Sequence, residues 1–325
     1  MRTLIRLGLV AACLAVLPAT SASTAAANPA GTNGRIVFGR YDPTVDDTVL
    51  YTINPDGSHE QQVLAIGLEC PHWSPDGTRI ATCGGPDQSA TAIVDPDTGT
   101  YRELPMSDPD LLTFCYIWTP DAKRLACEGF SDNDPNRNGI YTVRTSDGQG
   151  LRQLTSNPHG DDVPMSYSPN GKRLVFARYD LNEDSVGLFV INTDGTGLRR
   201  IAPAGVTCCS GGWSPQGNDI VFSRHVTPDV HSSMWIAHSD GTGLREVPAQ
   251  PAYGCGGPNS DPNAGGCFDP RWSPDGEQIV FGNGSDDLGR NIYTVKPDGT
   301  GLHQVTHGDA NQSNEAPDWG SHALS

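Results

Sequence analysis

Basic side chains are scarce in this sequence. Its 325 residues contain 21 Lys and Arg against 38 Asp and Glu, which gives a formal net charge of −17. Nucleic-acid binding needs Lys and Arg to neutralise phosphates, so this balance argues against DNA or RNA as a partner. Long apolar segments are rare as well. The run from 7 to 17 is too short to span a bilayer, and no later segment is a candidate transmembrane helix.

Signatures of catalysis are also missing. The sequence has no Gly-x-Ser-x-Gly nucleophile elbow, no His-Glu-x-x-His zinc motif and no glycine-rich phosphate loop. His59 and Glu60 are adjacent, but the second histidine of such a motif is absent. Ser, His and Asp are plentiful but scattered, so their spacing supports no catalytic triad. We therefore assign no catalytic residue and no cofactor-binding residue from the sequence.

What the sequence does contain is a repeat. Trp-Ser-Pro-Asp-Gly at 73–77 recurs with small changes at 118–122, 167–171, 213–217 and 272–276, and a truncated copy lies at 317–320. The aromatic residues that open these copies lie 45 to 59 residues apart. This period is typical of one four-stranded propeller blade and exceeds that of ankyrin or leucine-rich repeats.

Each repeat is predicted to form four strands, which we call a to d. The aromatic residue belongs to strand a, and the Pro-Asp-Gly turn leads into a β-rich strand b such as 173–176. Strand c, for example 292–295, is rich in β-branched and aromatic residues, and an Asp-Gly turn connects it to a short strand d. Tight turns therefore join a to b and c to d, while longer loops join b to c and d to a.

The two ends of the repeat region are complementary. Residues 34–38 form a strand b with no strand a before it, and residues 316–320 form a strand a with no strand b after it. If these segments pair, the ring has six blades and no free edge. The predicted fold is all-β: a six-bladed β-propeller of four-stranded antiparallel blades, closed by the C-terminal strand. The recurring aromatic residues are predicted to pack between adjacent blades.

The Trp-Ser-Pro-Asp-Gly-x-x-Ile-x-Phe pattern, followed by Ile-Tyr-x-x-x-x-Asp-Gly-Thr-Gly-Leu about 20 residues on, resembles the WD40-like (PD40) repeats of TolB-type propellers. The resemblance covers nearly all of 34–320. Related blades occur in the periplasmic Tol-Pal component, in propellers attached to prolyl-oligopeptidase-like hydrolases and in many secreted proteins, so it implies the fold far more than the function. The sequence ahead of the repeats is shorter than the α/β domain of the Tol component.

The N-terminus resembles a secretory signal. Arg2 and Arg6 precede the apolar run, and small residues ending at Ala27 suggest cleavage there. A lipobox-like sequence ends at Cys13, but the apolar region before it would be very short, so lipidation is disfavoured. The expected organisation is a signal peptide at 1–27, a linker at 28–33, the propeller at 34–320 and a tail at 321–325. We expect a secreted, extracellular or periplasmic (cell-envelope) protein.

Eight cysteines remain after Cys13, an even number that suits an oxidising compartment. Cys70 and Cys83 lie symmetrically about one a–b turn, and Cys115 and Cys127 lie about the next, so each pair is predicted to form a disulfide. For the remaining cysteines a vicinal bridge or two cross-loop bridges are both open; they are Cys208, Cys209, Cys255 and Cys267. A zinc site is disfavoured because the sequence has no Cys-x-x-Cys pair.

Acidic side chains gather in the b–c and d–a loops, which share one face of a propeller. These loops hold 21 Asp and Glu against four Arg. A charged surface that maintains solubility is one interpretation, and a binding surface for cations or a basic partner is the other. The richest loop alternates oxygen-bearing side chains and is the candidate Ca²⁺ site, with the ligands Asp132, Asp134, Asn136 and Asn138. An ordinary Asx-rich turn is the alternative, because the Gly and final Glu of an EF-hand loop are missing.

Three functions fit these observations. The first is an exported, non-catalytic binding or scaffolding module, expected to be a monomer, that presents its acidic loop face to a protein, a cell-envelope glycan or a cation. The second is a lyase or hydrolase whose site lies in the central channel, which a histidine-rich channel would support. The third is the accessory propeller of a separate hydrolase. The sequence favours the first, because it shows neither catalytic motifs nor a second domain.

Overall fold

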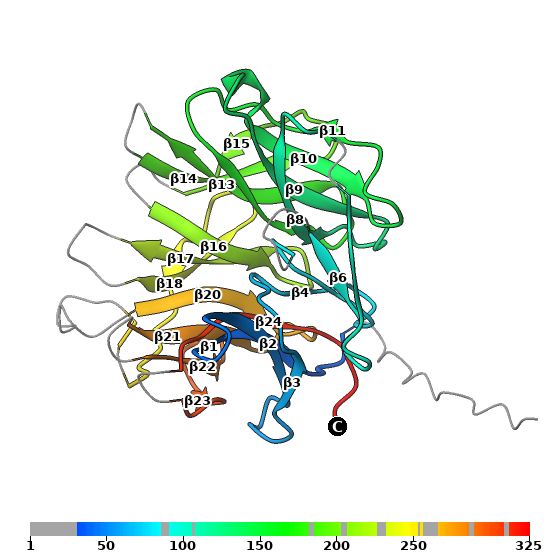
Figure 1. The fold of residues 1–325 in the computed structure, drawn as a ribbon. Coiled ribbons are helices and arrows are strands. Elements are labelled where there is room, and N and C mark those ends of the chain that lie inside the picture. The colour runs from blue at the N-terminus through cyan, green and yellow to red at the C-terminus, as the bar shows by residue number, and fades with distance from the viewer. Residues whose placement is uncertain are drawn as a thin grey trace, which may run out of the picture.

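The computed structural model describes residues 31–85, 91–105, 108–181, 185–202, 207–225, 232–252, 254–255, 266–285, 289–308 and 312–325. These residues form six four-stranded antiparallel sheets arranged as a ring, as predicted (Figure 1). In the part of the chain described, no helix is long and apolar enough to cross a membrane. The candidate signal peptide lies outside the described residues.

The strands follow the expected a-b-c-d order from the channel outward. Blade 1 comprises β24 (Asn314–Trp319), β1 (Ile36–Asp42), β2 (Asp47–Ile53) and β3 (Gln61–Leu64); blade 2 comprises β4 (His72–Trp73), β5 (Ile80–Ala81), β6 (Ala92–Val94) and β7 (Tyr101–Glu103). Blade 3 comprises β8 (Leu112–Trp118), β9 (Arg124–Phe130), β10 (Gly139–Arg144) and β11 (Arg152–Gln153); blade 4 comprises β12 (Asp162–Tyr167), β13 (Arg173–Asp180), β14 (Ser185–Asn192) and β15 (Arg199–Arg200). Blade 5 comprises β16 (Thr207–Trp213), β17 (Asp219–His225), β18 (Ser233–His238) and β19 (Arg245–Glu246); blade 6 comprises β20 (Gly266–Trp272), β21 (Ile279–Ser285), β22 (Gly289–Val295) and β23 (His303–Gln304).

The repeated turn residues explain why each a–b hairpin closes at the same place. In the first copy, the Ser74 hydroxyl donates to Asp76 Oδ1 at 2.6 Å and accepts the Arg79 backbone N–H at 3.0 Å. Gly77 donates its N–H to the Ser74 carbonyl at 2.8 Å and has φ 67°, a left-handed conformation that glycine adopts without strain. Ser168 with Asn170 and Ser273 with Asp275 repeat the side-chain contact. Side-chain hydrogen bonds therefore fix the turn that the sequence motif predicts.

The core lies between adjacent blades. Trp213 of blade 5, for example, packs in one cluster with Val175 and Leu188 of blade 4. The other repeated aromatic residues are also buried, each with at most 8% of its surface exposed: Trp73, Trp118, Tyr167 and Trp272. Every blade contributes to two such clusters, so the ring is held together mainly by apolar contacts between neighbouring blades.

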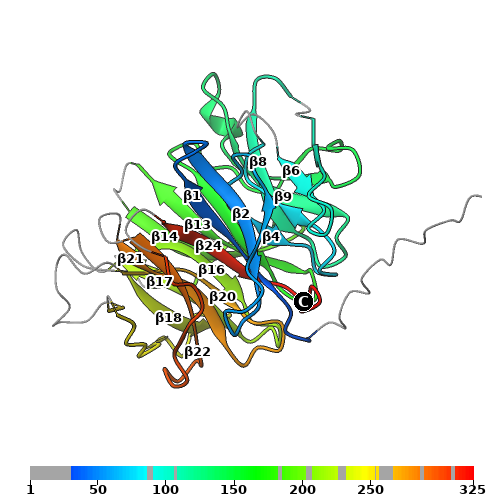
Figure 2. The ribbon, with the colours of Figure 1, turned by 60° about the horizontal axis from the view of Figure 1, so that its bottom comes forward.

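The C-terminal strand closes the ring. β24 pairs antiparallel with β1, with Ile36 opposite Trp319 and Val37 opposite Asp318. Figures 1 and 2 both show this red strand beside the blue β1. The Trp319 side chain is 5% exposed and donates its indole N–H to the Gly34 carbonyl at 2.9 Å. Two segments almost three hundred residues apart in sequence thus complete one blade.

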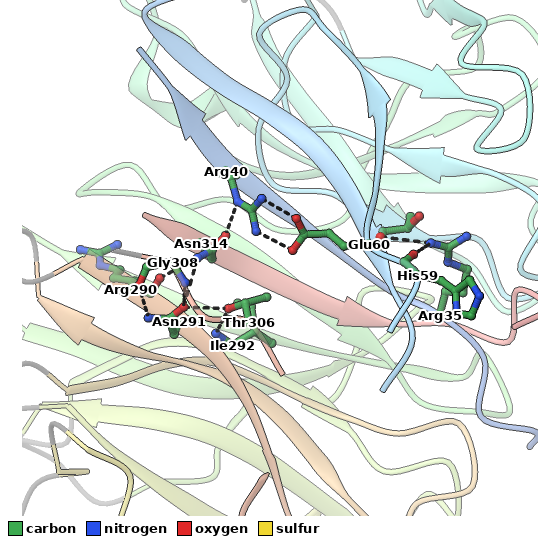
Figure 3. Close-up of polar contacts among 11 residues, drawn as sticks. Arg35, Arg40, His59, Glu60, Arg290, Asn291, Ile292, Thr306, Gly308 and Asn314 are labelled. Atoms are coloured by element: carbon green, nitrogen blue, oxygen red, sulfur yellow. Dashed lines mark hydrogen bonds and ion pairs between the residues drawn. The ribbon is translucent and has the colours of Figure 1, made fainter. Parts of the chain in front are cut away.

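Asn314 extends the closure to the neighbouring blade (Figure 3). Its side-chain oxygen accepts from Arg40 Nε of β1 at 2.6 Å, and its side-chain nitrogen donates to the Arg290 carbonyl of β22 at 2.9 Å. Arg40 also forms two hydrogen bonds of 2.7 Å with the Glu60 carboxylate. Asn314 is fully buried, so its own hydrogen bonds are shielded from water, and they join blades 1 and 6.

The segment after β24 also packs on the ring. Arg35 donates its backbone N–H to the His322 carbonyl at 3.0 Å and its side chain to the Ser325 hydroxyl at 2.6 Å. The His322 ring stacks on Trp73 of blade 2, with 5.0 Å between the ring centres. The residues predicted as a tail therefore contact blades 1 and 2.

Replacement of Trp319 by alanine should lower the free energy of unfolding by about 3–5 kcal/mol, because a buried aromatic side chain and its hydrogen bond are lost at the closing strand. Leu324→Ala is the control, since Leu324 is 54% exposed. Thermal and urea unfolding measure both variants. A Trp319→Ala variant as stable as the Leu324→Ala variant would contradict this role in closure.

Candidate functional site

The inner strands place one residue per blade at this level of the central channel. Side chains alternate between the two faces of a strand, so when the repeated aromatic residue points into the interblade core, the residue before it points into the channel. These six residues line one cavity of about 610 Å³ at the turn face; they are His72, Ile117, Ser166, Gly212, Arg271 and Asp318. The neighbouring aromatic position is nearly constant, whereas this position is different in every blade.

A second cavity, of about 340 Å³, opens at the loop face of the channel. The inner strands are irregular at this level, with shifts of register at Tyr116 in β8, at Met165 in β12 and at Asp269 in β20. A bulge re-aims the side chains beside it, and these residues line the cavity. Asp269 has φ 51°, a left-handed conformation that costs free energy for a residue with a side chain.

Three carboxylates stand around this loop-face cavity, on three successive blades. Glu69 precedes β4, Asp269 lies in β20 and Glu315 lies in β24. Glu315 accepts from the Thr48 hydroxyl at 3.3 Å and lies 3.2 Å from Arg290. Burial raises the pKa of Glu315, Arg290 opposes this, and the negative charges of Asp269 and Glu69 raise the pKa further. The mouth therefore concentrates negative charge.

Arg271 and His72 line both cavities and form the boundary between them. Arg271 Nη1 donates to the Gly211 carbonyl at 2.7 Å and to the Pro270 carbonyl at 3.2 Å. Its Nε is buried and has no hydrogen-bond partner among the described residues. In that part of the chain no carboxylate lies within ion-pair distance of Arg271, so its charge is balanced only at longer range.

Asp318 and His72 complete this level of the channel. Asp318 Oδ2 accepts the Trp73 N–H at 2.7 Å and lies 3.9 Å from His72 Nδ1. Burial raises the pKa of Asp318, and Arg271 opposes the shift. Burial and the charge of Arg271 lower the pKa of His72 well below its usual value, so the imidazole is neutral at pH 7. Its ring stacks on Tyr116, with 5.4 Å between the ring centres.

His72 is the single histidine among the described residues that line either cavity. Across the described chain, no three His, Cys, Asp or Glu side chains are grouped so that they could hold a metal ion. The sequence prediction missed this site, although the variable residue before each aromatic was a usable signal.

The predicted calcium loop lies far from the channel centre, before β10. Asp134 caps a 3₁₀ turn, η1 (Pro135–Arg137), and its Oδ1 accepts from the Asn136 N–H at 3.1 Å and from the Asn136 side chain at 3.0 Å. Asn138 is buried, and its Oδ1 accepts the Ser131 N–H at 3.0 Å. Of the four proposed ligands, Asp134 and Asn138 therefore already use side-chain oxygens within the loop. The Ca²⁺ site, including Asp132, stays a prediction.

The described residues include three disulfides. Cys70–Cys83 and Cys115–Cys127 have Cα–Cα distances of 5.3 and 3.9 Å and each brackets an a–b hairpin, as the register predicts. Cys255 bonds with Cys267, with Cα atoms 5.0 Å apart. Cys208 and Cys209 lie in β16, but their side chains are outside the described residues. Since Cys70 lines the loop-face cavity, one disulfide supports the channel mouth directly.

An acidic cluster lies between blades 3 and 4. Asp162 is fully buried and forms a 2.6 Å ion pair with Arg178, and the Thr155 hydroxyl donates to it at 2.6 Å. Nearby, burial raises the pKa of Glu128 to about 7, and the charges of Asp161 and Asp162 contribute to the increase. Burial likewise raises the pKa of Asp161. Glu128 therefore titrates near neutral pH.

This cluster predicts a specific pH dependence. Because the folded state binds the Glu128 proton more tightly than the unfolded state, stability from this residue should fall as pH rises from about 4.5 to about 7. Glu128→Gln should remove the loss and be more stable than the wild type at pH 8, by on the order of 3 kcal/mol. Urea unfolding at pH 4.5 and 8 measures the difference. If the difference in free energy of unfolding between variant and wild type is the same at both pH values, Glu128 has an ordinary pKa and the prediction is wrong.

No family model matches the sequence. A WD repeat-containing protein WDS homolog from Arabidopsis thaliana is 28% identical over 119 residues, which cover 36% of this chain and 20% of that relative. The chain thus spans about a fifth of the length of this curated relative.

Solved structures are similar to a larger part of the chain than this sequence relative is. TolB from Acinetobacter baumannii has a TM-score of 0.69 at 19% identity, covering 92% of this chain and 68% of that protein. A TolB from Agrobacterium tumefaciens has a TM-score of 0.65 at 15% identity, covering 89% and 99%. An oligogalacturonate lyase in complex with manganese has a TM-score of 0.56 at 15% identity, covering 84% and 74%. At these identities the likeness establishes the fold, which is that of a TolB-like six-bladed propeller.

Proposed function

We propose that this TolB-like propeller is an exported, non-catalytic binding module whose acidic loop face receives a basic partner, either a protein or a cell-envelope glycan that carries amino groups. The observation that carries the proposal is the convergence of Glu69, Asp269 and Glu315 around the loop-face mouth of the channel. They come from three different blades, so only the closed ring brings them together. The disulfides support export to an oxidising compartment.

The negative charge of the protein lies mainly on this face, which decides the kind of partner it attracts. The sequence places most of its excess acidic residues in the b–c and d–a loops, which belong to the same face as this mouth. A surface of one sign attracts partners of the opposite sign and speeds their association, and salt weakens the attraction. The partner should therefore bind with strong salt dependence, and its contact residues should be Lys or Arg.

The alternatives are a lyase or hydrolase with a channel site, or the accessory propeller of a separate hydrolase. The same fold occurs in an oligogalacturonate lyase and in a prolyl endopeptidase. A channel enzyme of this kind would be favoured by several histidines converging in the channel, whereas the described lining contains His72 alone. A lining with one histidine favours a binding role over a catalytic one.

Glu69→Gln combined with Asp269→Asn tests the acidic face, because both changes remove charge at nearly constant shape. Purified protein would be used to capture partners from culture supernatant and cell-envelope extract at 0.05 and 0.5 M NaCl. We expect the captured partner to be lost at least tenfold in the variant and in high salt. Asp56→Asn with Asp240→Asn is the matched control, since it removes two exposed charges from turns on the opposite face. Equal capture by both variants would refute the proposal.

A Ca²⁺ ion in the loop at 132–138 is a separate proposal. An ion there would have to compete with the Asp134–Asn136 hydrogen bonds. Millimolar CaCl₂ should raise the melting temperature more than NaCl of equal ionic strength, and Asp132→Ala with Asp134→Ala should remove the difference. Equal shifts with the two salts in the wild type would mean that the loop is an ordinary solvated turn.

A further inference from the structure

Arg271 has no carboxylate within ion-pair distance among the described residues, unlike three other arginines near the loop face. Arg40 pairs with Glu60 at 2.7 Å, Arg178 with Asp162 at 2.6 Å and Arg290 with Glu315 at 3.2 Å. Arg271 instead donates to two backbone carbonyls, and its buried Nε has no partner in the described structure. An unpaired guanidinium facing a cavity is a ready site for a carboxylate, which it binds through a planar fork of N–H donors.

The wall of the same cavity has the opposite charge. Glu69, Asp269 and Glu315 stand around its loop-face mouth, while Arg271 stands at its inner end beside a neutral His72. A simple anion would have to pass the carboxylates to reach Arg271. A simple diamine would satisfy the carboxylates but leave Arg271 without a directly bonded carboxylate, since Asp318 acts on it only at longer range. A molecule that carries a carboxylate at one end and a cationic group at the other meets both requirements.

We propose that the loop-face cavity binds a small basic zwitterion, either a basic amino acid or the C-terminal basic residue of a peptide. Its carboxylate pairs with Arg271, and its side-chain cation lies against Glu69 and Asp269. The volume of about 340 Å³ is within the range of small-molecule sites. Tyr116 and Met165 in the lining provide apolar contact for the methylene chain between the charged ends.

This inference goes beyond the proposed function, because Arg271 lies inside the channel and not on the rim that receives a macromolecular partner. The two can be tested separately. An Arg271 variant should lose recognition of the small ligand and still capture the basic partner. The double variant of Glu69 and Asp269 should lose both.

Three related probes isolate each charge. Lysine carries both ends, cadaverine is lysine without the carboxylate, and norleucine is lysine without the side-chain ammonium. Isothermal titration of the wild type with each should show lysine binding at least tenfold more tightly than either analogue. Arg271→Gln should bring lysine and cadaverine to within threefold of each other. Glu69→Gln with Asp269→Asn should bring lysine and norleucine to within threefold of each other.

Arg173→Gln is the matched control. Arg173 lies over the Trp213 ring at 4.8 Å and lines neither cavity, so its loss should leave the preference for lysine unchanged. If a melting test shows that Arg271→Gln is unstable, Arg271→Lys takes its place. This variant keeps the charge but lacks the planar fork of N–H donors, so it should retain part of the preference for lysine. Equal affinity of the wild type for lysine and cadaverine, or no heat with any probe at millimolar concentration, would overturn the proposal.

Discussion

The pairing of β24 with β1 is the interaction on which the rest of the structure depends. Without it, blade 1 lacks its inner strand and the ring has two exposed strand edges, which a β-protein must cover. Trp319 packs with Ile36, Phe38 and residues of blade 6, so the same contact fills the core on both sides of the junction. Because the paired segments lie at opposite ends of the sequence, this stabilisation is non-local.

Closure of the ring also brings the charged side chains of the channel together. β24 places Asp318 between Arg271 of blade 6 and His72 of blade 2, and it places Glu315 at the mouth beside Asp269 and Glu69. The charged groups of the channel are thus concentrated on the three blades that meet at the closing strand. The opposite side of the same level holds Ile117, Ser166 and Gly212, which are uncharged. A ligand in the channel would therefore be oriented by one side of the ring.

The sequence predicted those features that a local pattern determines. The period gave six blades, the half-blades at the termini gave the closing pair, and symmetry about a turn gave Cys70–Cys83 and Cys115–Cys127. The channel site could not be derived in the same way. His72, Arg271 and Asp318 each precede a repeated aromatic residue, so the repeat indicates that they face the channel. Their distances from one another depend on ring closure, and the bulges at the loop-face cavity are marked by no motif. The absence of a carboxylate beside Arg271 is likewise a property of three-dimensional packing.

The central claim is that closure assembles a channel with an inner cationic site and an acidic mouth. Its most direct test is a crystal structure of the protein with millimolar lysine. The account predicts the lysine carboxylate on the Arg271 guanidinium, with an ammonium group within 3.2 Å, roughly the hydrogen-bond limit, of Glu69 or Asp269. Lysine bound elsewhere, or bound with its carboxylate directed away from Arg271, would contradict it.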